Sequence, residues 1–308
     1  MTAIAETLCP GQRGWLWYVP ARVTQNDELP PAVTAALAAP ASPVESTVEA
    51  AGIRFHALTW GAADAPPVLM LHGVTSTAAT WWRMGPAVAA AGFRIVAPDL
   101  PGHGLTGQWT GHHRFRDNAA DLVAFVRAAG LERPDLRIVG HSWGAMTAAA
   151  MPSAGVVPAR LVLLDPPAVP LSAIAAMLED PEEHPYDDIG VAIAAIGPLN
   201  PTWPYGDVVA KAEGLTQFDE AAVRAVLTQN GDWDGGLASL ADPQAQRTPV
   251  WLIRGDPAAG GYVPDAVLPA FAARIGADRV ITIQGAPHSP QRTHPEALAR
   301  ALLRSLRD

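Results

Sequence analysis

The chain has 308 residues, of which 49% are hydrophobic and 17% charged, and its formal net charge is −9. Disordered chains combine low hydrophobicity with high charge, so this composition excludes them and predicts an ordered globule. The basic residues form no run, and Lys211 is the only lysine. This distribution argues against nucleic acid and against an anionic membrane surface as partners.

A single cysteine, Cys9, can form neither an internal disulfide nor a cysteine-based zinc site. Residues 1–5 lack the basic and long apolar character of a signal peptide, and no apolar run reaches the length of a membrane span. We therefore expect a cytoplasmic protein without a metal and without a membrane contact.

The N-terminal residues 1–43 differ in composition from the rest and are expected to form an extension of the folded unit. Residues 13–19 have a strand-like pattern, and the alanines and prolines of 30–43 suggest a tether. After them, residues 44–50 and 53–60 alternate polar and apolar side chains and are joined at Ala51-Gly52. This pattern predicts a β-hairpin.

Short apolar runs bounded by turn residues follow at 68–71, 93–97, 136–139, 161–164, 250–253 and 280–283. Such runs are typical of strands that are buried on both faces, as in parallel sheets. Helical stretches are expected at 77–91, 117–130, 144–155, 264–275 and 295–306. Because strands and helices alternate, the sequence predicts an α/β fold with a mostly parallel central sheet of about eight strands and helices on both faces.

The alternation breaks between residues 166 and 247, where prolines interrupt helical pieces and no strand is predicted. We interpret 44–165 and 248–308 as the core. Residues 166–247 would be a helical cap at the sheet edge where such folds bind ligands. Trp203 is expected to face the cleft as part of an apolar roof, and Trp81 and Trp82 are further candidates for substrate contact.

The strongest motif is Gly140-His141-Ser142-Trp143-Gly144, which follows a predicted strand and precedes a predicted helix. In this setting G-x-S-x-G is typical of a nucleophile elbow, which presents its serine on a tight turn. The glycines allow close approach of the backbone, and the amino end of the helix favours an oxyanion. The motif predicts that Ser142 is a catalytic nucleophile.

With this motif, the chain from about residue 44 to residue 308 resembles the α/β-hydrolase fold superfamily. The supporting motifs are His72-Gly73-Val74 and the segments 98–104, 164–167, 254–257 and 285–288. The resemblance implies a carboxylesterase-like serine hydrolase, with nucleophile, acid and histidine in that order along the chain. It implies no cofactor.

The resemblance also assigns roles to further residues. The backbone N–H groups of Val74 and Trp143 would hold the oxyanion, and His72 would support the turn rather than react. The general base would be His288, which follows the last strand, although Pro287 stands where the family usually has a glycine.

Two carboxylates compete for the acid of the triad. Asp256 follows the seventh strand, which is the common place in the family, whereas Asp165 follows the preceding strand. The familiar spacing after Gly255 falls on Ala258, in a loop that residues 258–261 lengthen. We expect Asp256 to be the acid and keep Asp165 as the alternative.

The expected reaction is hydrolysis of a carboxylic ester of a small, largely apolar molecule through an acyl-enzyme. Haloalkane dehalogenases and epoxide hydrolases share the fold but use an aspartate nucleophile, so Ser142 argues against both. Cleavage of an amide, a lactone or a carbon–carbon bond on the same triad stays open. So does a non-catalytic small-molecule receptor. The sequence leaves the oligomeric state open.

Overall fold

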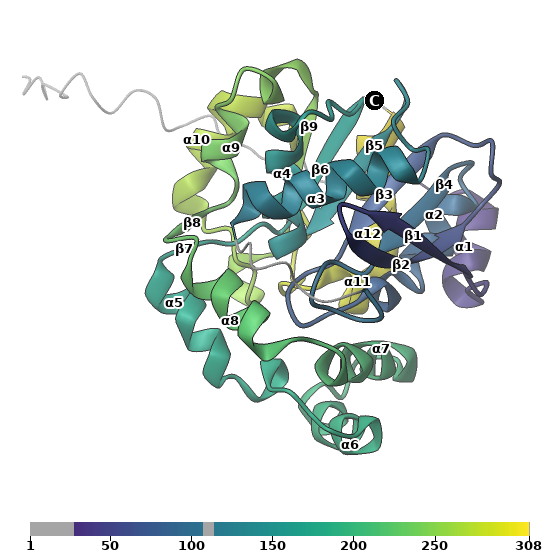
Figure 1. Cartoon of the computed structure of the whole chain (residues 1–308), viewed down its shortest axis with the longest axis vertical. Helices are drawn as coiled ribbons and strands as arrows, with labels where there is room; N and C mark the ends of the chain where they lie inside the picture. Colours follow the sequence, from purple (N-terminus) through teal and green to yellow (C-terminus); the bar gives the residue numbers. More distant parts are fainter. Residues whose placement is uncertain (1–27, 107–113, 308) are drawn as a thin grey trace, which may run out of the picture.

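An eight-stranded sheet forms the centre of the molecule, and helices lie against both of its faces (Figure 1). The computed structural model describes residues 28–106 and 114–307. Cys9 and the strand expected at residues 13–19 lie outside these residues. The α/β-hydrolase fold predicted from the sequence is confirmed.

The sheet has the strand order β1-β2-β4-β3-β5-β6-β9-β10. Its strands are β1 (Val44–Ala50), β2 (Ile53–Trp60), β3 (Pro67–Leu71), β4 (Arg94–Pro98), β5 (Arg137–His141), β6 (Arg160–Leu164), β9 (Val250–Arg254) and β10 (Val280–Thr282). Strands β1 and β2 form the predicted hairpin and β2 pairs antiparallel with β4, while the other pairs are parallel. In the hairpin turn, Ala51 and Gly52 have φ values of 52° and 75°, as a two-residue turn of this kind requires.

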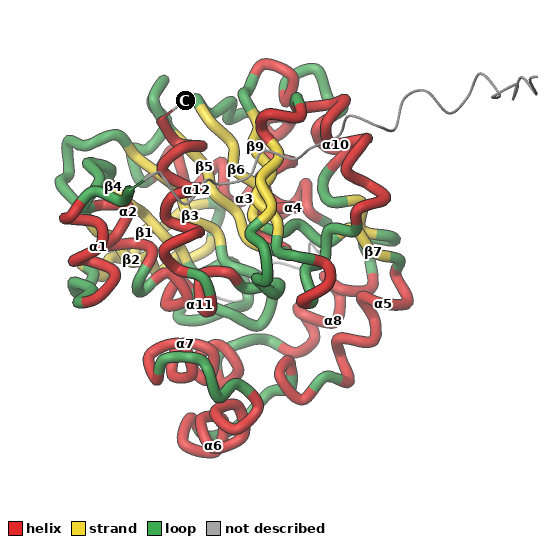
Figure 2. Tube along the Cα trace, turned by 180° about the vertical axis from the view of Figure 1, so that it is seen from behind, coloured by secondary structure: helices red, strands yellow, loops and turns green. Residues whose placement is uncertain are grey.

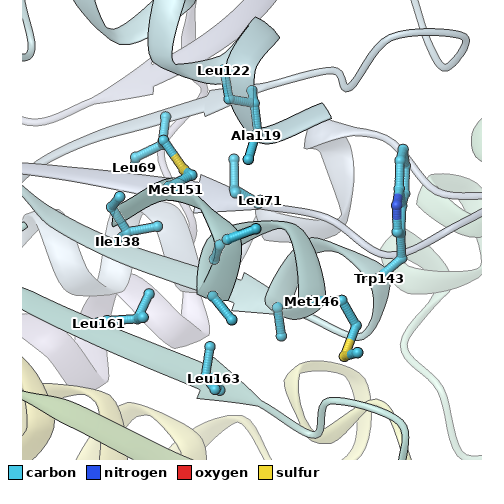
Figure 3. Close-up of a cluster of buried hydrophobic side chains, with 14 of the residues drawn as sticks. Leu69, Leu71, Ala119, Leu122, Ile138, Trp143, Met146, Met151, Leu161 and Leu163 are labelled. Atoms are coloured by element: carbon cyan, nitrogen blue, oxygen red, sulfur yellow. The ribbon is translucent and has the colours of Figure 1, made fainter. Parts of the chain in front are cut away.

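Helices cover the two faces of the sheet in two groups. One face carries α3 (Phe115–Ala128), α4 (Trp143–Ala154) and α10 (Leu268–Ile275), and the other carries α1 (Pro31–Ala38), α2 (Met84–Ala89) and α12 (Pro295–Arg307). Along β3, Leu69 and Leu71 join the first core, and Val68 and Met70 join the second. Figure 3 shows the first core around α4, with Leu161 and Leu163 of β6 beside it. Burial on both faces explains why these strands are continuous apolar runs.

The expectation of a tether is wrong for residues 31–38, which form α1. Pro31 stands in the first turn, where a proline costs no hydrogen bond, and alanines favour the turns that follow. Val33 is fully buried in the core shared with α2 and α12. This helix therefore packs as part of the main core.

Between β6 and β9 the chain forms mostly helices. They are α5 (Leu171–Ala176), η2 (Met177–Glu179), η3 (Pro181–Glu183), α6 (Ile189–Leu199), α7 (Tyr205–Thr216), α8 (Glu220–Thr228) and α9 (Leu237–Leu240). Of these, α5, α6, α7 and α8 lie at one end of the molecule (Figures 1 and 2), whereas α9 lies beside α10 (Figure 1). The expectation of no strand here is wrong, because β7 (Ala168–Val169) pairs antiparallel with β8 (Trp233–Asp234). Strands of two residues are too short to leave an alternating pattern in the sequence. Within the described residues, no helix is both long and apolar enough to cross a membrane.

Candidate active site

Ser142 occupies a tight turn between β5 and α4, with φ 54° and ψ −123°. A Cβ on Gly140 would lie 2.3 Å from the carbonyl oxygen of Gly144, and a Cβ on Gly144 would lie 2.4 Å from that of His72. Only glycine fits at either position. The predicted strand, turn and helix around the motif are confirmed, and the positive φ of a non-glycine residue is the kind of strain that clusters at active sites.

A chain of hydrogen bonds links Ser142, His288 and Asp165. The Ser142 hydroxyl donates to Nε2 of His288 over 2.9 Å, and Nδ1–H of His288 donates to Oδ2 of Asp165 over 2.6 Å. Ser142 is 3% exposed and Asp165 is fully buried. These contacts have the geometry of a serine–histidine–aspartate triad, in which the histidine can take the serine proton and the carboxylate orients the ring.

The prediction of Asp256 as the acid is wrong, and the alternative Asp165 occupies that place. Asp165 directly follows β6, which pairs with β5, the strand that leads to Ser142, whereas Asp256 follows β9, one strand farther away. The Asp165 carboxylate also accepts the N–H groups of Gly255 and Tyr262, each over 2.9 Å. Three donors therefore fix its orientation.

Asp256 closes a turn of its own loop instead. Its carboxylate accepts the backbone N–H of Ala258 and that of Gly285, both over 3.0 Å. These two bonds, led by the one from Gly285, hold the pKa of Asp256 below its usual value. The residue caps η5 (Pro257–Ala259), and its carboxylate is thereby directed at backbone rather than at His288.

Two further rings contact His288. The ring centroid of His141 lies 4.8 Å from that of His288, and the centroid of Tyr262 lies 4.2 Å from it. Nε2–H of His141 donates to the His288 carbonyl over 2.9 Å. Burial, then the neighbouring His288, lowers the pKa of His141 well below its usual value, so His141 stays neutral beside the triad. Sequence reasoning missed both contacts; the lengthened loop before Tyr262 was the available signal.

The turn after β3 lies against the serine. His72 donates from Nδ1–H to the Gly73 carbonyl over 2.7 Å and accepts the Leu100 N–H at Nε2 over 2.9 Å, which confirms its predicted supporting position. A Cβ on Gly73 would lie 3.1 Å from the Cβ of Ser142. Val74 lines the same cavity as Ser142. Trp143 is the first residue of α4, so its N–H has no acceptor within the helix.

A cavity of about 40 Å³ lies beside Ser142 and His288. Glu183, Lys211 and Arg292 line it, and Met177 is the one large apolar side chain among the described residues that do so. The expected apolar roof is therefore wrong. In the described part of the chain, no group of three His, Cys, Asp or Glu side chains is placed to hold a metal ion.

The model of the alpha/beta hydrolase family matches residues 68–301. The chain belongs to this family. Over 107 residues the hydrolase is 34% identical to epoxide hydrolase A of Mycobacterium tuberculosis, an alignment that covers 34% of this chain and 33% of that one. The chain thus spans about a third of the length of the curated relatives it matches.

Solved structures show the same fold over most of the hydrolase. An E-2-(acetamidomethylene)succinate hydrolase superposes with a TM-score of 0.72 at 22% identity, covering 86% of this chain and 100% of that chain. An esterase from Rhodococcus sp. superposes with a TM-score of 0.65 at 20% identity, covering 86% and 98%. These similarities extend the fold assignment beyond the aligned sequence segments.

The only lysine of the hydrolase is buried beside the serine. Lys211 donates to Glu183 over 3.0 Å and to the hydroxyl of Thr75 over 3.1 Å, and Thr75 also contacts Glu183. Burial lowers the pKa of Lys211, and the charge of Glu183 opposes that shift. The pair connects α7 and η3 with the turn that carries Val74. Its members lie far apart in the sequence, so no motif marked them.

The three tryptophans expected at the substrate do not line the cavity. Trp81 is fully buried in the core with α2 and α12. Trp82 donates from its ring N–H to Asp207 over 2.9 Å. Trp203 packs with the side chains of α6 and α7, and the Arg292 guanidinium lies 4.5 Å from its ring centroid. Those predictions are wrong, because Trp81 packs in the core, Trp82 contacts Asp207 of α7, Trp203 packs against α6 and α7, and charged side chains line the cavity instead.

His103 is a buried neutral histidine beside the same turn. Its Nε2 accepts the Thr75 N–H over 3.3 Å, and its ring centroid lies 5.0 Å from that of Trp143. Burial lowers its pKa to about 3. Below pH 6.5 the unfolded chain binds a proton at this histidine and the folded chain does not. The contribution of His103 to the free energy of unfolding is therefore complete above pH 6.5 and is lost as the pH falls towards 3.

We expect the His103→Gln variant to show a shallower loss of stability in acid than the unmodified hydrolase. Each proton bound only by the unfolded state contributes a slope of about 1.4 kcal/mol per pH unit, and the variant lacks one such proton. Urea unfolding at several pH values between about 4.5 and 7.5 measures the two slopes. Equal slopes in the two proteins would show that His103 is charged in the folded state.

Proposed function

We propose that this hydrolase cleaves a carboxylic ester of a small molecule through an acyl-enzyme on Ser142. The hydrogen-bonded chain from Asp165 through His288 to Ser142 carries the proposal. His288 takes the hydroxyl proton as Ser142 attacks the carbonyl carbon, and then gives it to the leaving alcohol. Water enters by the same route and releases the acid.

The backbone would stabilise the negative oxygen of the tetrahedral intermediate. We assign this role to the N–H groups of Val74 and Trp143, which belong to the turn after β3 and the start of α4. Thr75, the residue after Val74 in this turn, has a φ of 53°, which is an uncommon value for a β-branched residue. The Lys211 and Glu183 contacts to its side chain support the same turn.

Serine chemistry favours acyl transfer over the reactions of several relatives. Epoxide hydrolase A is a sequence relative, and an esterase and a succinate-derivative hydrolase share the fold. If Ser142 opened an epoxide, it would form an ether, which water does not hydrolyse under mild conditions. Attack on an ester forms another ester, which the same triad can hydrolyse. Ser142 therefore supports ester cleavage, and amide, lactone or carbon–carbon cleavage are the alternatives.

We further propose that residues 166–247 act as a cap that shapes the substrate site. Met177, Glu183 and Lys211, which line the cavity with Ser142, all come from this segment. The proposal predicts that substrate choice depends on them more than on the core helices.

Methanol partitioning tests the acyl-enzyme. Several esters that share one acyl group but differ in leaving group are hydrolysed in dilute methanol, and the ratio of methyl ester to free acid is measured. A common acyl-enzyme gives the same ratio for every leaving group, because the partition occurs after the alcohol has left. A ratio that follows the leaving group contradicts the mechanism. Turnover of styrene oxide with no turnover of any ester contradicts the reaction class.

A further inference from the structure

Arg292 is a buried cation in the wall of the cavity. It lies in the short helix α11 (Pro290–Thr293), a few residues beyond His288, and is 7% exposed. It lines the cavity together with Ser142 and His288. A guanidinium at this place would meet the part of a substrate next to its reacting carbonyl.

The guanidinium has no hydrogen-bond acceptor within the described residues. It lies over the face of the Trp203 ring, with 4.5 Å from the guanidinium carbon to the ring centroid. Stacking of this kind leaves the N–H donors at the edges of the guanidinium unused. A buried guanidinium is costly unless water or a ligand accepts its hydrogen bonds, so these donors are available to an anion in the cavity.

The acidic side chains nearest Arg292 already have partners. Asp207 accepts from Arg83 over 2.5 Å and from Trp82, and Glu183 pairs with Lys211. Glu182 accepts from Asn200 over 3.1 Å. These carboxylates are close enough to favour the charged guanidinium, but none of them accepts a hydrogen bond from it.

Arg83 fixes the backbone that carries Arg292. It donates to the carbonyl oxygen of Gln291 over 3.1 Å and to that of Arg292 over 2.8 Å, while Asp207 of α7 holds the same guanidinium. The position of Arg292 therefore depends on an ion pair between the segment 166–247 and the core. Such pre-organisation is what a site that binds a charged group needs.

We propose that Arg292 binds a carboxylate that the substrate carries close to its scissile acyl group. This inference rests on the proposed function, because it places the anion in the cavity beside Ser142. A planar guanidinium can donate two parallel hydrogen bonds to a carboxylate. The substrate class would be half-esters of short dicarboxylic acids, which replaces the apolar ester expected from the sequence.

The charge of the cavity favours a single negative charge. Lys211 and Glu183 neutralise each other, and Arg292 adds one positive charge. A dianionic phosphate would leave a negative charge buried near Glu182, Glu183 and Asp207, which is costly. The cavity is also small, at about 40 Å³, which suits a short acyl chain.

Matched esters test the proposal in the unmodified hydrolase. We expect kcat/KM for para-nitrophenyl hydrogen succinate to exceed that for para-nitrophenyl isocaproate, its neutral isostere, by about 100-fold. The Ser142→Ala variant supplies the background rate, which intramolecular attack raises for the half-ester. Equal kcat/KM values for the two esters would overturn the proposal, as would a preference for the ester of phosphonopropionic acid.

Substitutions at Arg292 test whether this residue causes the preference for the anionic ester. Arg292→Met should lower the ratio of the two kcat/KM values by about 100-fold, and Arg292→Lys should lower it less, since it keeps the charge without the planar donors. The control Arg224→Met removes an exposed arginine of α8 and should keep the ratio. An unchanged ratio in Arg292→Met would overturn the assignment; if that variant does not fold, Arg292→Lys decides.

A binding measurement separates this inference from the proposed function. If no ester is turned over faster than in Ser142→Ala, the proposed function fails and the anion site is judged by calorimetry alone. Monomethyl succinate, which carries a single negative charge, should bind the Ser142→Ala variant and should bind the Ser142→Ala, Arg292→Met double variant at least about 30-fold more weakly. Equal binding, or no binding, would overturn the carboxylate site.

Discussion

Replacement of Ser142 by alanine is expected to lower ester turnover by about 10⁴–10⁶-fold while the protein stays folded. The hydroxyl forms the acyl bond in the proposed mechanism, and no other group can replace it in the hydrogen bond to His288 Nε2. Alanine adopts the turn at φ 54° with the same strain as serine, so the melting temperature should change little. Steady-state kinetics with para-nitrophenyl esters measures the loss.

Ser153→Ala is the matched control for this experiment. Ser153 belongs to the same helix α4 but is exposed to solvent, so its loss should leave kcat unchanged. A serine-directed phosphonate should add one adduct to the unmodified protein, on the peptide that contains Ser142, and none to Ser142→Ala. Retained activity in Ser142→Ala, or an adduct on another serine, would contradict the mechanism.

The sequence predicted the parts of the site that depend on local backbone geometry. Around Ser142, the two flanking glycines are required by contacts within a few residues and with the neighbouring turn, so a short motif contains the information. The strands were predictable for a similar reason. Burial on both faces requires a continuous apolar run such as that of β3, whatever its partners.

Which of Asp165 and Asp256 serves as the acid of the triad does not depend on local sequence. Both residues follow parallel strands at the same edge of the sheet, Asp165 after β6 and Asp256 after β9. The outcome depends on the strand order, which places β6 next to β5, and on the loop that brings Tyr262 back to the carboxylate of Asp165. The spacing of residues within one loop does not contain that information.

The charged lining of the cavity could not be predicted from the sequence pattern either. Prolines and aromatic residues in 166–247 suggested an apolar roof, but Trp203 packs among α6 and α7 and stacks on Arg292. Lys211 and Glu183 meet only because α7 and η3 fold back over the turn after β3. Single charged residues in a helical segment are usually exposed, so their burial followed from tertiary packing alone.

Asp165→Asn is expected to lower kcat by about 10⁴-fold, with a smaller effect on KM. An amide at this position cannot accept from His288 Nδ1–H, Gly255 N–H and Tyr262 N–H together, because one of its two heavy atoms is itself a donor. The histidine then loses the orientation and the charge stabilisation that the carboxylate supplies. Some stability should also be lost, by about 1–3 kcal/mol, since a buried donor is left without an acceptor.

Asp256→Asn makes the same chemical change in the other candidate and serves as the control. Its carboxylate accepts from Ala258 and Gly285 in a partly exposed turn and does not contact His288, so kcat should stay within about threefold of the unmodified value. The kinetics are compared per active site, counted by phosphonate titration, so that partial unfolding of Asp165→Asn does not pass for lost catalysis. If Asp256→Asn is the inactive variant, or Asp165→Asn keeps kcat, then Asp165 stabilises the loop after β9 and the histidine acts without it.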